Sequence, residues 1–127
     1  MQRQLEAFYG MILACAGFGV WAFFSLMPVL AGHGIREGWD MAPFWLVGVP
    51  LLLMLHGLAG ALTEESAWRL PFWAIGGHIL AMMLIHPTGT GLGLLPFAVI
   101  FIGVPMYVIF FLATMTGRMV GRRLGSA

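Results

Sequence analysis

Four long apolar runs divide this chain, and none of them contains Asp, Glu, Lys or Arg. The hydrocarbon core of a bilayer is about 30 Å thick, so a helix needs roughly 20 consecutive apolar residues to cross it. Only 9% of the residues are charged, against roughly 25% in soluble domains. We therefore predict an all-α integral membrane bundle of four transmembrane helices, forming one domain over residues 1–127. The predicted spans cover residues 8–31, 43–62, 71–86 and 94–116.

Prolines interrupt three of the predicted spans. Pro28, Pro50 and Pro105 all lie inside apolar runs. Each lacks a backbone N–H, and its ring clashes with the preceding turn of helix. We expect a kink near each of them.

The arginines predict the orientation of the bundle. Arg3 precedes the first run and three arginines follow the last, whereas the 32–40 and 63–69 loops are each slightly acidic. Because basic flanks stay in the cytoplasm, both termini are expected there, in agreement with an even number of spans. We expect the inner (plasma) membrane of a bacterium. The basic tail, which we interpret as a topology signal, carries Arg118, Arg122 and Arg123.

Two histidines, His56 and His78, lie within the second and third spans. A short turn joins these spans, and the two positions fall at a similar depth below the cytoplasmic surface. Small residues near each histidine allow close approach of helix backbones. We therefore expect both imidazoles to face the interior of a tight hairpin. The small residues expected at helix contacts are Gly57, Gly60, Ala74, Gly77 and Ala81.

Three interpretations of this histidine pair remain open. In the first, each imidazole is neutral and bonds a backbone carbonyl or the other ring, as polar groups in lipid require. In the second, His56 and His78 are the axial ligands of a b-type haem, although a tight hairpin leaves little width for a porphyrin. In the third, the histidines are polar positions along a proton or substrate path.

Two further histidines, His33 and His86, fall together at the outer face, with Glu37 and Asp40 near His33 in sequence. Such residues are possible ligands for zinc or copper. Their spacing matches no ligand motif, and solvated loop histidines are the simpler interpretation. Cys15 is the single cysteine, which excludes an intrachain disulfide.

These observations favour a non-catalytic protein. No acidic residue lies near His56 or His78 in the sequence to orient an imidazole for catalysis, and the arginines form no stripe that could follow nucleic-acid phosphates. We predict a structural or accessory subunit that lies in the lipid bilayer and packs in a larger membrane complex or a homo-oligomer, with no cofactor assured. The alternative is a b-type haem electron carrier or membrane anchor. A third possibility is a small oligomeric channel or transporter whose proline-broken spans line the path.

Overall fold

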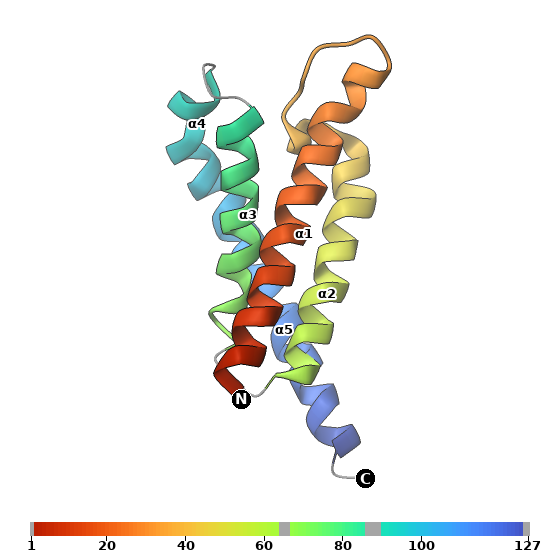
Figure 1. The fold of residues 1–127 in the computed structure, drawn as a ribbon, viewed down its shortest axis with the longest axis vertical. Coiled ribbons are helices and arrows are strands. Elements are labelled where there is room, and N and C mark those ends of the chain that lie inside the picture. The colour runs from red at the N-terminus through yellow and green to blue at the C-terminus, as the bar shows by residue number, and fades with distance from the viewer. Residues whose placement is uncertain (1, 64–66, 86–89, 126–127) are drawn as a thin grey trace.

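The computed structural model describes residues 2–63, 67–85 and 90–125, and every regular element in these ranges is helical. The helices pack side by side in a bundle (Figure 1). The prediction of an all-α bundle is confirmed. In chain order the elements are α1 (Gln2–Leu30), η1 (Gly38–Asp40), η2 (Phe44–Gly48), α2 (Val49–Leu62), α3 (Leu70–Ile85), α4 (Thr90–Ala98), η3 (Val99–Gly103) and α5 (Val104–Gly125).

Three helical stretches are long and apolar enough to cross a membrane, namely Gln4–Leu30, Phe44–Leu62 and Leu95–Gly125. These lengths and compositions indicate a membrane protein. Helix α3 is also apolar but has only 16 residues. At 1.5 Å per residue it is about 24 Å long, shorter than the hydrocarbon core. The predicted third span ends at His86, which lies outside the described residues.

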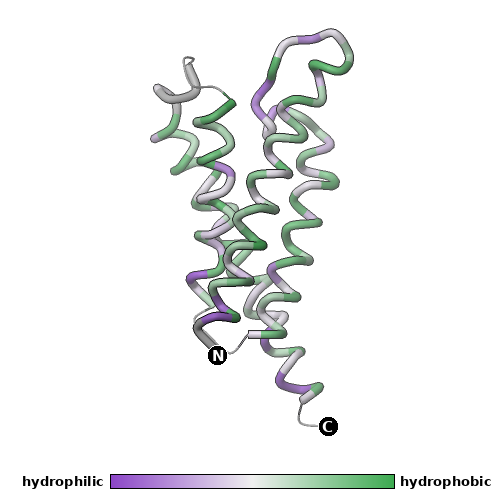
Figure 2. Tube along the Cα trace, viewed as in Figure 1, coloured by the Kyte–Doolittle hydropathy of each residue, from purple (hydrophilic) through white to green (hydrophobic). Residues whose placement is uncertain are grey.

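The outward-facing surface of the helices is apolar. Leu46 is 74% exposed, Met54 73% and Phe101 72%. Figure 2 shows hydrophobic residues along most of each helix, with hydrophilic residues gathered mainly in the connection after α1 and at the ends of the chain. Exposed apolar surface of this extent is unfavourable in water but suits contact with lipid tails.

Both termini lie at the same end of the bundle (Figure 1). This arrangement agrees with the predicted even number of crossings. The last helix continues to Gly125, beyond the predicted end of its span at residue 116. The arginine tail is therefore helical, which fixes the angular positions of its side chains.

Two of the prolines follow a widened turn of helix. Phe44–Gly48 and Val99–Gly103 are π-helical turns, and Pro50 and Pro105 come two residues after them. A proline ring clashes with the carbonyl four residues earlier, and in both cases that carbonyl lies inside the π turn. The wider turn, which bonds over five residues instead of four, relieves the clash. Pro28 lies inside α1.

The helices form two tight pairs, α1 with α3 and α2 with α5. Helices α2 and α3 are consecutive in the chain but touch far less. In Figure 1 they lie on opposite sides of α1. The expectation of a tight hairpin between the second and third spans is therefore wrong. The last helix begins beside α3, as α4, and ends beside α2, as α5.

Glycines let α1 and α3 meet backbone to backbone. A Cβ on Gly17 would collide with the carbonyl oxygen of Ala74, and a Cβ on Gly77 would collide with that of Ala14. Close approach increases van der Waals contact, which drives helix association in lipid. Gly19 differs, because a Cβ there would meet nothing within 4 Å.

Replacing Gly17 by alanine should lower the free energy of unfolding by about 1–3 kcal/mol, because the methyl group forces two backbones apart. Gly19→Ala is the matched control on the same helix. It should be neutral or slightly stabilising, since alanine is the better helix former by about 1 kcal/mol. Unfolding in maltoside–dodecyl sulfate mixed micelles, followed by circular dichroism, measures both. Equal stability of the two variants would contradict this account of the α1–α3 contact.

Candidate functional site

Helices α2 and α5 also pack through glycines. His56, the first candidate histidine, lies on α2 next to this contact. A Cβ on Gly60 would collide with the carbonyl oxygen of Thr114, and a Cβ on Gly117 would collide with that of Gly57. The two backbones therefore touch along the turn of α5 from Thr114 to Gly117. His56 lies one turn before Gly60, on α2.

The glycines of α5 were missed in the sequence analysis. Ala113, Gly117 and Gly121 recur every four residues, the spacing that places small residues on one helix face. A Cβ on Gly121 would lie 2.6 Å from the carbonyl oxygen of Ala61. That spacing is the signal in the sequence that indicates this contact face.

Four of the five small residues predicted at helix contacts have different partners from those expected. Gly57 and Gly60 face α5, whereas Ala74 and Gly77 face α1. Ala81 is fully buried. The reason is steric: α1 and α5 bring glycines or carbonyls of their own to these positions, so backbone contact forms there and not between α2 and α3.

His56 is fully enclosed, with 0% of its surface exposed. Its Nδ1 lies 2.7 Å from the carbonyl oxygen of Leu52, one turn earlier on the same helix. Its ring stacks on Phe110 of α5, with centroids 4.4 Å apart and planes 12° apart. The imidazole is therefore part of the packed contact between α2 and α5.

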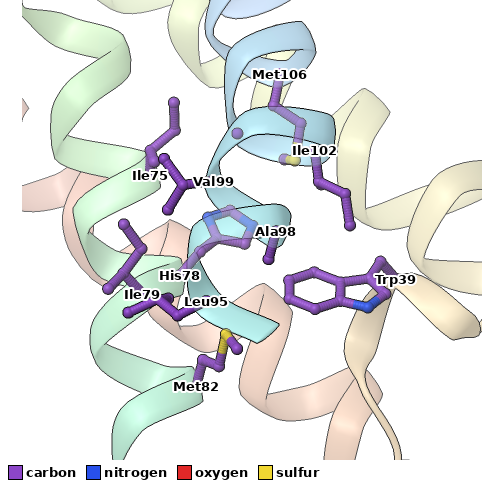
Figure 3. Close-up of a pocket in the computed structure, with 11 residues that line it drawn as sticks. Trp39, Ile75, His78, Ile79, Met82, Leu95, Ala98, Val99, Ile102 and Met106 are labelled. Atoms are coloured by element: carbon purple, nitrogen blue, oxygen red, sulfur yellow. The ribbon is translucent and has the colours of Figure 1, made fainter. Parts of the chain in front are cut away.

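His78 has the same local arrangement in the other helix pair. Its Nδ1 lies 2.7 Å from the carbonyl oxygen of Ala74, and the ring of Phe44 meets it edge-on at 6.0 Å. The imidazole lies in a cavity of about 30 Å³ between α3 and the last helix (Figure 3). Trp39 and Met106 also line this cavity. Apart from His78, the lining side chains are apolar or aromatic.

The backbone contacts determine which ring nitrogen carries the proton. A carbonyl oxygen can only accept, so in each neutral imidazole Nδ1 donates and Nε2 keeps its lone pair. The Nε2 atoms of His56 and His78 are both buried, with no hydrogen-bond partner among the described residues. Each histidine thus presents one unused acceptor to the protein interior.

The surroundings of these two rings do not fit a haem. Axial ligation would require an open slot beside Nε2, and pockets for cofactors and ligands of ordinary size occupy roughly 300–1,000 Å³. The ring of His56 is stacked on Phe110, and the cavity at His78 measures about 30 Å³. That volume suits one or two water molecules.

The second histidine pair is only partly described. His33 is exposed, in the connection after α1, and His86 lies outside the described residues, so their predicted proximity stays a prediction. Within the part of the chain that the structure describes, no group of three or more His, Cys, Asp or Glu residues could hold a metal ion.

An open apolar groove runs along the outer side of the α1–α3 pair, with a volume of about 590 Å³. Cys15 is exposed there. Gly76 also lines the groove, and a Cβ on it would meet nothing within 4 Å. The lining combines small residues with large apolar ones: Ala14, Cys15, Gly76 and Gly77 with Phe18, Phe72, Trp73 and Leu80.

The two enclosed imidazoles and this groove are the candidate features within the bundle. No protein-family model, curated protein or solved structure matches the chain. What the chain does is therefore inferred from its own residues.

Replacing His56 by alanine should lower the free energy of unfolding by about 2–4 kcal/mol, because it removes a buried ring that fills the contact with Phe110. The same mixed-micelle titration measures the effect. Leu58→Ala is the matched control, since Leu58 lies two residues along α2 and is 56% exposed. A loss no larger than that of the control would show that the His56 ring is not a packing element.

The protein, purified in mild detergent after expression with a haem precursor, should show no α-band in a reduced-minus-oxidised absorbance spectrum. The reason is the lack of a porphyrin-sized slot at either ring. A sharp α-band that disappears in both His56→Ala and His78→Ala would contradict this reading and restore the haem hypothesis.

Proposed function

We propose that this chain is a non-catalytic integral membrane subunit that associates with another membrane-spanning helix through the groove on the outer side of α1 and α3. The observation that carries the proposal is the groove itself: an apolar recess of about 590 Å³ on a surface that faces lipid.

Small residues on a lipid-facing surface support a protein occupant. Glycine destabilises a helix by about 1 kcal/mol relative to alanine. Contact with lipid tails does not offset this loss of helix stability. Gly19 and Gly76 both face open space in the single chain, and Gly19 lies one turn after Cys15. Close packing of another helix gives these glycines a role, since small residues are what membrane helices place at their interfaces.

The non-catalytic role is supported by how the polar side chains are used. His56, His78 and Thr114 each bond the carbonyl four residues earlier on their own helix. This is the first of the three interpretations of the histidines, with the carbonyl as partner. Side chains engaged in this way contribute to packing and leave few polar groups for binding a substrate.

The membrane and its orientation belong to the same proposal. We place the chain in a bacterial plasma membrane with both termini in the cytoplasm. The arginine bias supports this orientation, and so does the position of both termini at one end of the bundle.

A second candidate is a small oligomeric channel or transporter. It is favoured by the cavity at His78, where a buried Nε2 without a partner lies beside a space large enough for water. A polar group of this kind can serve as a step in a proton path. Proton flux into liposomes, abolished by His78→Phe, would favour this function over a purely structural one.

Cys15 offers a direct test of the groove. If a second copy occupies it, copper–phenanthroline oxidation in native membranes should give a disulfide-linked dimer, because Cys15 is the sole cysteine and is exposed in the groove. The matched control is Cys15→Ala combined with Leu58→Cys, which moves the thiol to the lipid-facing side of α2. This variant should cross-link far less.

If the partner is another protein, no dimer forms. A photo-cross-linker at position 15 should then give one adduct of defined mass, and the same group at position 58 should not. Failure to obtain either product from position 15, in membranes where the protein is folded, would rule out the groove as a contact surface.

A further inference from the structure

A second recess lies at the end of the bundle where both termini are found. It is formed where the end of α2 meets the last turns of α5 and has a volume of about 520 Å³. Unlike the groove on α1 and α3, it is lined by polar groups. Thr63, Arg118 and Arg122 provide these groups, and Gly60 and Gly121 bring the two backbones together beneath them.

Arg118 is the unusual residue of this recess. Its Nε and Nη2 are buried, and neither has a hydrogen-bond partner among the residues that the structure describes. Buried donors without a partner are rare, because desolvation of a polar group costs free energy that only a new hydrogen bond offsets. A charged donor makes that cost larger. We therefore expect these two nitrogens to donate hydrogen bonds to a bound acceptor.

The identity of the two nitrogens indicates the shape of that acceptor. Nε and Nη2 lie along the same edge of the planar guanidinium group, and one N–H bond of each points in the same direction. Together they form the fork that binds two oxygens of a phosphate or carboxylate at once.

Arg122 adds a second positive charge one turn further along α5, and its side chain is exposed. Like charges four residues apart on a helix repel each other, so an anion shared between Arg118 and Arg122 relieves that repulsion. A phosphate monoester suits this arrangement better than a carboxylate, because it offers three acceptor oxygens and close to two negative charges at neutral pH, whereas a carboxylate offers two oxygens and one charge.

Thr63 adds a complementary group. Its hydroxyl donates to the carbonyl oxygen of Ala59 at 2.8 Å, so its oxygen is left to accept only. It can receive a hydrogen bond from a hydroxyl or protonated group next to the phosphate. The recess thus provides donors for the anion and one acceptor for its substituent.

We propose that this recess binds a phosphate group at the membrane–water interface, held by the Nε–Nη2 fork of Arg118 and by Arg122. The phosphate belongs either to the headgroup of an anionic lipid or to a soluble phosphorylated molecule. This site is separate from the groove on α1 and α3 and does not depend on the proposed association.

The experiment uses the full chain, purified in a non-ionic detergent and free of phosphate. Calorimetric titration with inorganic phosphate tests the soluble source, with chloride at matched ionic strength as reference. Native mass spectrometry after addition of phosphatidic acid or phosphatidylcholine tests the lipid source. Selective retention of phosphatidic acid identifies a lipid headgroup, and a response to inorganic phosphate without selective retention of phosphatidic acid identifies a soluble phosphate.

Arg118→Gln should weaken binding of the active probe by at least about tenfold, the usual effect of losing a charge-assisted pair of hydrogen bonds. Arg118→Lys keeps the charge and loses the fork, and it should weaken binding by a similar factor while preserving the fold. Arg123→Gln is the matched control, because it removes the same charge from the same helix but Arg123 does not line the recess. Its binding should stay within about twofold of the parent.

Two results would overturn the proposal. In the first, neither probe binds. In the second, Arg118→Gln and Arg123→Gln weaken binding equally. Binding would then depend only on the net positive charge of the tail and not on the Arg118 fork. Glu64 and Glu65, which follow Thr63 in the sequence, lie outside the described residues. If the parent fails to bind phosphate but the Glu64→Gln/Glu65→Gln double variant binds it, the first result is explained: these carboxylates pair with the arginines in place of an anion.

Discussion

The distance at which two helix backbones can approach each other controls this bundle. At Gly17 and Gly77 in one pair, and at Gly60 and Gly117 in the other, a carbonyl of the partner helix occupies the space that a methyl group would need. Lipid tails are as apolar as the side chains they surround, so no hydrophobic force selects one helix partner over another. Steric fit at these few positions therefore decides which helices pair.

Polar side chains contribute little to the choice of partner. His56, His78 and Thr114 bond carbonyls of their own helices, so the donor of each side chain is paired wherever the helix happens to pack. A bond that does reach across the fold joins the hydroxyl of Tyr107 to the carbonyl oxygen of Trp68 at 3.1 Å. The interior is thus compatible with lipid before the helices assemble, and packing then fixes their arrangement.

The helices could be predicted from the sequence because an apolar run is a local property. Their pairing could not, because small residues occur on every helix and the short connection pointed to α2 with α3. The choice depends on which carbonyl each glycine faces. The spacing of Gly117 and Gly121 was visible, and these residues could have been found. The buried fork of Arg118 could not, because it depends on a side-chain conformation set by the packed neighbours.

The widened turns before Pro50 and Pro105 allow one helix to serve two neighbours. An additional residue in a turn rotates every later side chain by about 100° around the axis. The second helix places Gly48, the last residue of its widened turn, against Val20 and Phe24 of α1. Further along, the same helix places Gly60 against α5. The last helix likewise changes from α3 to α2. A straight helix buries one face along its whole length, whereas the second and last helices bury a different face at each end. This change of face joins the two helix pairs into one molecule.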